Sequence, residues 1–366
     1  MALSAVGSQG YSGAVTDPAA TTAGITAASM NAIETAYVAA FREGFEQAYQ
    51  QTESKLQPYF ESETQNSEYQ YFDRIGEAEA MSEITTRLGN NPTSQITHDR
   101  RRIGLKDYEL GKYVDEKDLK RVVTDPMNAY TQALLASGKR KIDDIIIDKY
   151  FGTAETGKTG GTSIAFVQPD TAEDATHIKI GEKSAGGITT TYDASTNPNG
   201  YLVETGNFEG FSVGSQYVAS GAAAESGLTL DKLRAVRSTM LRLHAIDQDE
   251  VINCFVGAKQ LDDLLSINEV INSDFSVRKN LAEGNVVSFM GFRFIHTERL
   301  PLSANGTERR VMVCLPKALK LSTGEGLKGD MWRDPSKKNA PYIYYKLCAD
   351  ATRMWGEVSG EIRCAE

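Results

Sequence analysis

The length, composition and charge of the chain exclude several classes of protein. The chain has 366 residues, 40% of them hydrophobic, which is enough for one large domain or two to three small ones. No apolar run approaches the length needed to cross a bilayer, and the N-terminus lacks the basic segment of a signal peptide. The net charge of −10 argues against tight nucleic-acid binding through a basic surface.

The cysteines and histidines show neither the spacing of a disulfide framework nor that of a metal site. The four cysteines lie singly without a CxxC pair, and the four histidines form no HxH or HExxH pattern. We therefore expect reduced cysteines in strands, no metal and no cofactor. The residues are Cys254, Cys314, Cys348, Cys364, His98, His177, His244 and His296.

The first 60 residues are predicted to form an N-terminal arm followed by a helix. Residues 1–28 are mainly Ala, Ser, Gly and Thr, so they cannot bury a core alone and are expected to be flexible or ordered by partners. Ser29 is a good cap for an amphipathic helix that continues to about Leu56-Gln57, before Pro58.

Residues 61–115 have the pattern of an extended β-hairpin loop. Strands are predicted over residues 70–76 and 101–110, with a turn at residues 89–92. Two long strands with a polar tip are too thin to have a core of their own, so the loop needs another surface to lie on.

A cluster of charges in this loop gives the candidate contact residues of the chain. Arg100, Arg101 and Arg102 precede the acidic residues Asp115 and Glu116. We predict that the three arginines anchor the loop to an acidic neighbouring subunit; a solvated charged loop is the alternative.

The segment from Asp125 to Tyr150 is predicted to be one long helix. Asp125 is a suitable N-cap, Pro126 occupies the first helical position, and apolar residues recur at helical spacing up to Tyr150. The helix is expected to end at Phe151-Gly152 and to span roughly 38 Å at 1.5 Å per residue.

The remaining two hundred or so residues divide into a Gly-rich segment, an α/β block and a β tail. Adjacent carboxylates within the helices, Asp143-Asp144 and Asp262-Asp263, are expected on solvated faces. Strands are predicted over 163–167, 177–180, 201–203, 251–256, 292–296, 310–315, 318–322, 342–349 and 361–364, and helices after Thr229 and over 259–267.

Two enzyme motifs match by letter but not by context. Residues 152–159 fit the GxxxxGK[ST] phosphate loop, with Lys158 in the lysine position, yet a helix rather than a buried strand precedes them. Residues 210–214 fit the GxSxG nucleophile elbow around Ser212, but the approach is turn-like. A P-loop ATPase and a serine hydrolase are therefore kept only as weak alternatives.

The order of these elements resembles the major capsid protein of tailed bacteriophages, with the Hong Kong 97 type shell fold. The likeness covers roughly residues 35–150 and 205–366. The segments that carry it are 71–76 (YFDRIG), 125–152, 227–233 (GLTLDKL), Gln260-Leu261 with Leu264-Leu265, 272–275 (NSDF), 291–295 (GFRFI) and Leu300-Pro301.

The resemblance implies an α+β fold with named parts. These are the N-terminal arm and helix (1–60), the extended loop (61–115), a peripheral domain with a spine helix at 125–150 (116–152 and 305–366), a Gly-rich β segment or insertion (153–225), and an axial α/β domain (226–304). In this family the arm and the extended loop lie over adjacent subunits.

The resemblance also implies the function. We expect a structural protein, not an enzyme, whose copies form the hexamers and pentamers of an icosahedral head around double-stranded DNA. Scaffolding, portal and decoration proteins are the expected partners, the virion is the expected location after assembly in the host cytoplasm, and no membrane is involved. An encapsulin-like compartment shell is the alternative within the same fold. Some relatives cross-link subunits through Lys, Asn and Glu, and no such trio is assigned here.

Overall fold

The computed structural model describes most of the chain outside its N-terminal arm. Among the predictions that lie outside the described residues are the helix before residue 50, the turn at 89–92, Asp115, Glu116, the helix cap at Asp125-Pro126, and His177. The described residues are 50–76, 81, 83, 93, 96, 98–114, 127–167, 178–180, 189–192, 201–204, 208–218, 221–222, 224–247, 250–267, 288–304 and 306–366.

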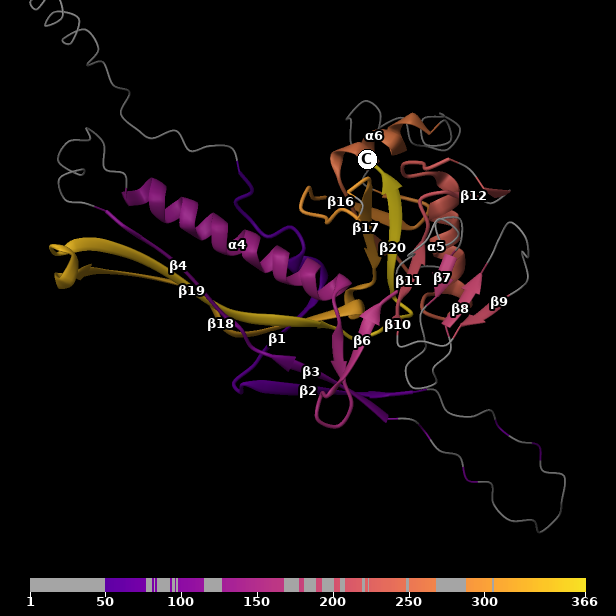
Figure 1. Ribbon diagram of the computed structural model, residues 1–366, viewed down its shortest axis with the longest axis horizontal. Coiled ribbons are helices and arrows are strands. Elements are labelled where there is room, and N and C mark those ends of the chain that lie inside the picture. The colour runs from indigo at the N-terminus through magenta and orange to yellow at the C-terminus, as the bar shows by residue number, and fades with distance from the viewer. Residues whose placement is uncertain are drawn as a thin grey trace, which may run out of the picture.

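The long helix predicted around residues 125–150 is confirmed. Helix α4 runs from Met127 to Phe151 over 25 residues and stops before Gly152. Its C-terminal half is buried through Ile142, Ile146 and Tyr150, whereas its N-terminal half is largely half-exposed. The helix therefore joins the core at one end and projects from it at the other, as Figure 1 shows.

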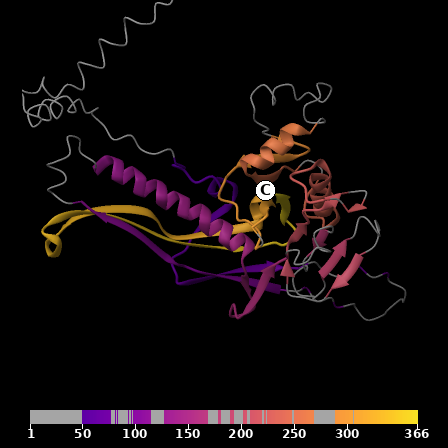
Figure 2. The same ribbon diagram turned by 45° about the horizontal axis from the view of Figure 1, so that its top comes forward.

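A long, twisted β ribbon, here called the blade, runs alongside α4 (Figures 1 and 2). Its four strands lie in the order β1-β18-β19-β4, with β1 parallel to β18 and the other neighbours antiparallel. Strands β18 and β19 are far longer than the predicted 318–322 and 342–349. The bounds are β1 Glu61–Thr64, β18 Leu319–Asp334, β19 Ala340–Arg353 and β4 Asp107–Tyr113; helical turns η5 (Pro316–Ala318) and η6 (Pro335–Lys337) flank β18.

The base of the predicted hairpin is present, but its second strand is shorter than predicted. Strand β2 (Tyr69–Ile75) pairs with β3 (His98–Gly104) in antiparallel register. The prediction of one strand over 101–110 was wrong, because the chain leaves this sheet at Leu105-Lys106 and continues as β4 of the blade. The Tyr69 ring packs closely on the backbone at Gly104, where a Cβ would lie 3.1 Å from the ring.

The hairpin belongs to a five-stranded sheet that includes part of the Gly-rich segment. The strand order is β10-β6-β5-β3-β2. In Figures 1 and 2 this sheet and α4 lie on opposite sides of the blade. The added strands are β5 Ala154–Thr156, β6 Thr162–Phe166 and β10 Phe208–Glu209.

The elements described so far form one lobe of the subunit. A sheet of nine described strands forms the centre of the second lobe, which also carries helices α5 and α6 (Figure 1). Its order is β15-β16-β14-β17-β20-β11-β7-β8-β9. The predicted helix after Thr229 is confirmed, and the Thr229 side chain accepts a hydrogen bond from the Lys232 N–H. The bounds are α5 Leu230–Arg242, α6 Ala258–Ser266, β7 Ile178–Ile180, β8 Thr189–Tyr192, β9 Tyr201–Glu204, β11 Phe211–Val213, β14 Ile252–Val256, β15 Ser288–Phe289, β16 Phe292–His296, β17 Glu308–Cys314 and β20 Ser359–Ala365; β12 (Tyr217–Val218) and β13 (Gly221–Ala222) pair separately.

The C-terminal tail is divided between the two lobes. Strands β18 and β19 lie in the blade beside α4, whereas β17 and β20 pair with each other inside the nine-stranded sheet. Two strands of this tail, β17 and β20, therefore lie near the centre of the nine-stranded sheet. The assignment of residues 305–366 to a peripheral domain stays a prediction.

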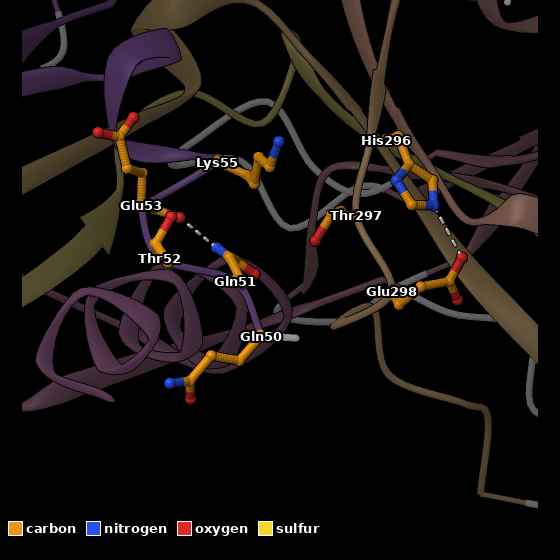
Figure 3. A pocket seen from close by; sticks show the side chains of 8 residues that line it. All are labelled: Gln50, Gln51, Thr52, Glu53, Lys55, His296, Thr297 and Glu298. Atoms are coloured by element: carbon orange, nitrogen blue, oxygen red, sulfur yellow. Dashed lines mark hydrogen bonds and ion pairs between the residues drawn. The ribbon is translucent and has the colours of Figure 1, made fainter. Parts of the chain in front are cut away.

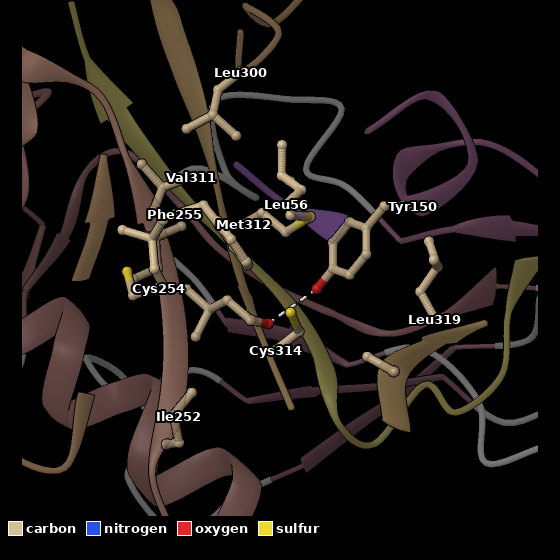
Figure 4. Close-up of a cluster of buried hydrophobic side chains, with 14 of the residues drawn as sticks. Leu56, Tyr150, Ile252, Cys254, Phe255, Leu300, Val311, Met312, Cys314 and Leu319 are labelled. Atoms are coloured by element: carbon tan, nitrogen blue, oxygen red, sulfur yellow. Dashed lines mark hydrogen bonds between the residues drawn. The ribbon is translucent and has the colours of Figure 1, made fainter. Parts of the chain in front are cut away.

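One continuous hydrophobic core joins the lobes (Figure 4). The side chain of Tyr150, at the end of α4, reaches into it, and its hydroxyl lies 2.9 Å from the carbonyl oxygens of Val313 and Gly360. Burial raises the pKa of this hydroxyl well above its usual value. Cys254, Cys314 and Cys364 are free and buried in strands of this core, as predicted.

The approach to this core from the N-terminus differs from the prediction. Residues 50–56 are not helical, and within the described residues 50–60 the only helical element is a short 3-10 turn, η2 (Gln57–Tyr59). Asp143, expected on a solvated face, is fully buried and accepts hydrogen bonds from Ser54 and from the backbone N–H groups of Lys55 and Leu56. The N–H groups of residues 55 and 56 therefore bond to this carboxylate rather than to carbonyl groups of a helix.

Candidate assembly surfaces

The root of the extended hairpin contains a buried group of charges, here called the Glu209 cluster: Arg74, Asp99, Arg101, Glu209 and Arg353. Glu209 Oε1 lies 2.7 Å from Arg101 Nη2 and 3.1 Å from Arg74 Nη1, and its Oε2 lies 3.5 Å from Arg353 Nε. Arg74 also pairs with Asp99. One carboxylate on β10 thus ties both hairpin strands to β19 of the blade.

The electrostatics of the cluster follow from its burial. Burial alone would raise the pKa of Asp99, but hydrogen bonds from Thr156 and Arg74 hold that pKa below its usual value. Burial lowers the pKa of the Arg353 guanidinium, and the charge of Glu209 opposes this change. Arg353 also donates to the carbonyls of Tyr150 and Gly152 at 2.6 and 2.9 Å, which fixes the C-terminal end of α4.

The three arginines predicted as contact residues point in two directions. Arg101 is completely buried and faces its own subunit through Glu209. Arg100 and Arg102 lie on the outer face of the hairpin, paired with Asp73 and Glu155. Strand alternation causes this division, because successive side chains project to opposite faces.

The outer face of the hairpin is rich in tyrosine and arginine. The Arg100 guanidinium lies 5.4 Å from the Tyr71 ring centre, and that of Arg102 lies 4.9 Å from the Tyr69 ring centre. Both rings are exposed. Tyrosine and arginine are enriched in protein interfaces, so this face has the composition of a contact surface.

The blade carries a second exposed aromatic surface near its outer end. Tyr113, Tyr342 and Trp332 stand side by side on β4, β19 and β18, and Tyr344 lies next to Trp332. The register places these residues on the opposite face from Tyr108 and Lys112, which contact Lys141 and Tyr130 of α4. They are thus on the blade face that α4 does not cover.

The two enzyme motifs do not have the geometry that their chemistry needs. Residues 152–159 begin at the end of α4, continue through β5 and turn into β6, so no strand-loop-helix cradle forms. Ser212 lies within β11 with its side chain fully buried, and its Oγ donates to Glu361 Oε1 at 2.7 Å. A nucleophile elbow instead requires an exposed Oγ at a sharp turn.

A polar cavity of about 410 Å³ lies between residues 50–55 and the segment that follows β16 (Figure 3). His296 Nε2 lies 3.0 Å from Glu298 Oε1. Burial alone would raise the pKa of Glu298, but hydrogen bonds from the Ala258 N–H and His296 keep it below its usual value. In the described part of the chain, no group of three or more His, Cys, Asp or Glu side chains is arranged to hold a metal ion.

The blade, the spine helix α4 and the paired strands β2 and β3 define the Hong Kong 97 type fold of a shell-forming subunit. The chain belongs to the phage capsid protein family, whose sequence profile matches residues 33–366. No curated protein matches the chain. Within the described residues, no helix is both long enough and apolar enough to span a membrane.

Solved capsid structures share this fold at low sequence identity. The capsid of cyanophage P-SCSP1u is 13% identical, with a TM-score of 0.62, over 91% of this chain and 94% of that one. The mature capsid of bacteriophage PhiM1 is 12% identical, with a TM-score of 0.58, over 88% and 91%. The capsid of a native GTA particle is 14% identical, with a TM-score of 0.56, over 92% and 98%. The chain is thus a structural capsid subunit of the virion, and the resemblance found in the sequence is confirmed.

Proposed function

We propose that this chain is the major head subunit of a tailed phage and assembles as hexamers and pentamers into an icosahedral shell around double-stranded DNA. The family match over residues 33–366 carries the proposal. The exposed aromatic surfaces support it, because a hairpin and a blade that project from the core need neighbouring subunits to cover them.

The shell function needs no catalytic site. Lys158 lies in a strand-to-strand connection and Ser212 is buried, so a P-loop ATPase and a serine hydrolase are both disfavoured. An encapsulin-like compartment is disfavoured by the phage capsid family match. Lys158→Ala and Ser212→Ala are expected to leave assembly unchanged, and neither ATP nor ester hydrolysis is expected of the parent protein.

The contact residues, partner proteins and place of assembly expected from the sequence are also proposed. The outward residues Arg100 and Arg102 of the hairpin are proposed contact sites, with Asp115 and Glu116 further along the chain. Scaffolding and portal proteins, and decoration proteins where present, are the proposed partners, and assembly is proposed to take place in the host cytoplasm. An acidic wall suits this role, because it does not bind the enclosed DNA tightly.

Light scattering combined with negative-stain electron microscopy of the purified protein tests the proposal. The protein is examined alone and after co-expression with the neighbouring phage proteins. Closed shells, tubes or rings of five and six subunits are the expected result. A persistent 40.0 kDa monomer under both conditions contradicts the proposal.

A further inference from the structure

The Glu209 cluster holds one more positive charge than negative charges. Three guanidinium groups face two carboxylates: those of Arg74, Arg101 and Arg353 against those of Glu209 and Asp99. The arginine side chains are at most 2% exposed, and that of Asp99, the most open of the five, is 18% exposed. A buried charge without a counter-charge strongly destabilises a fold, so the excess charge calls for a partner.

Arg101 is the least satisfied member of the cluster. Its side chain is fully buried, and its Nη2 donates to Glu209 Oε1 at 2.7 Å. Within the described part of the chain, its Nε and Nη1 have no hydrogen-bond partner, and neither has Nε of Arg74. Arg353 differs, because it donates to three backbone carbonyls whose dipoles offset part of its charge. Arg74 and Arg101 therefore have buried N–H donors available for a further acceptor.

These two arginines project from the same, inner face of the hairpin. Strands β2 and β3 pair Phe72 with Arg101 and Arg74 with Asp99, and residues that are directly opposite or two apart share a face. Apolar side chains surround them there, since Phe72 packs with Ile103 and Met354. Such surroundings have a low dielectric constant, which strengthens the attraction of a guanidinium group for a small anion.

We propose that the Glu209 cluster binds one small monovalent inorganic anion, of the chemical class of chloride, beside Arg74 and Arg101. One such ion balances the excess charge and accepts hydrogen bonds from N–H groups that have no other acceptor. A doubly charged anion would reverse the sign of the net charge instead of cancelling it. The bound ion ties β2 to β3 at the root of the hairpin, a role that goes beyond the shell function and does not depend on it.

Quenching of Trp355 by bromide tests the site directly, because the Arg74 guanidinium lies 5.0 Å from the Trp355 ring centre. Trp332→Phe removes the other tryptophan of the chain, which is exposed on the blade. Dissociated subunits of this variant are titrated with sodium bromide, with sodium gluconate keeping the ionic strength constant. A saturable loss of fluorescence that chloride reverses is expected. A loss that rises linearly with bromide and that chloride does not reverse marks collisional quenching alone and overturns the proposal.

Urea unfolding of the parent subunit gives a second measurement. An ion that binds the folded state alone raises the folding equilibrium constant in proportion to its concentration once the site is mostly filled. A tenfold rise in chloride above half-saturation is therefore expected to raise that constant nearly tenfold, with gluconate again keeping the ionic strength constant. Equal urea midpoints in chloride and in gluconate overturn the proposal.

A matched pair of variants on β3 assigns the chloride dependence to the cluster. Arg101→Gln removes one positive charge, so the four charged groups that remain in the cluster are balanced. Arg100→Gln removes the same charge from the adjacent position, where the side chain is exposed and pairs with Asp73. The dependence is expected to disappear in Arg101→Gln and to persist in Arg100→Gln, and an equal dependence in both overturns the proposal. If Arg101→Gln does not fold, the parent midpoints and the bromide titration decide the question.

Discussion

Substitution of Glu209 tests directly whether this carboxylate attaches the β2-β3 hairpin to the blade. Glu209→Gln preserves the size of the side chain and an oxygen acceptor but removes the charge. In the folded subunit that carboxylate is almost fully buried and faces Arg74, Arg101 and Arg353 within 3.5 Å. The substitution leaves three buried guanidinium groups with Asp99 as their remaining acidic partner in the cluster.

The expected loss of folding stability is large because buried guanidinium groups lose the carboxylate that they share. Removing one member of a buried ion pair typically costs about 3–5 kcal/mol. The amide oxygen of the variant retains part of the hydrogen bonding to Arg101 and Arg74, so the lower end of that range, about 3 kcal/mol, is expected. In urea this corresponds to a midpoint lower by roughly 1 M.

The assay is urea unfolding of dissociated subunits, followed by tryptophan fluorescence. Trp355 suits it, because the Arg74 guanidinium lies 5.0 Å from its ring centre. Glu68→Gln is the matched control: the residue is exposed, and the same charge is lost with an expected change within about 0.5 kcal/mol. Equal midpoints for the two variants would refute the reasoning and show that Glu209 does not anchor the hairpin.

Three further changes test other contacts. Asp143→Asn is expected to lower stability by about 2–3 kcal/mol, because the buried carboxylate accepts bonds from residues 51–56, and faster protease cleavage there would show it. Tyr150→Phe is expected to cost about 1 kcal/mol by urea unfolding, since it leaves the carbonyls of Val313 and Gly360 without the hydroxyl; an unchanged midpoint contradicts this. The pKa values of Asp99 and Glu298 are lowered in the folded state, so their carboxylates stabilise the fold at a pH above their unfolded pKa values near 4. That stabilisation is lost as the pH falls through the folded pKa values. Urea midpoints measured from pH 5 to 2 should therefore decline, and the decline should be smaller in Asp99→Asn.

The periodic and capped elements could be predicted from the sequence. Gly152 marked the end of the long helix, Thr229 marked the start of α5, and the apolar run before Gly257 gave β14. Each of these signals is local, so no knowledge of distant residues is needed to interpret it.

Contacts between distant segments could not be predicted in the same way. Asp143 has the pattern of a solvated helix face, and only the arrival of residues 51–56 in space makes it buried. Glu209 stands in a Gly-rich stretch, and its partners lie 108, 135 and 144 residues away. The strands of the blade were underestimated because their outer halves carry exposed polar and aromatic side chains without a simple alternation.

The position of β20 has a consequence for the timing of biogenesis. This strand, Ser359–Ala365, is the final element along the sequence, yet it lies inside the nine-stranded sheet between β17 and β11. While a ribosome is still making the preceding residues, β17 and β11 have a gap between them and their apolar faces stay uncovered. Completion of the nine-stranded sheet must therefore wait until this segment has emerged from the ribosome.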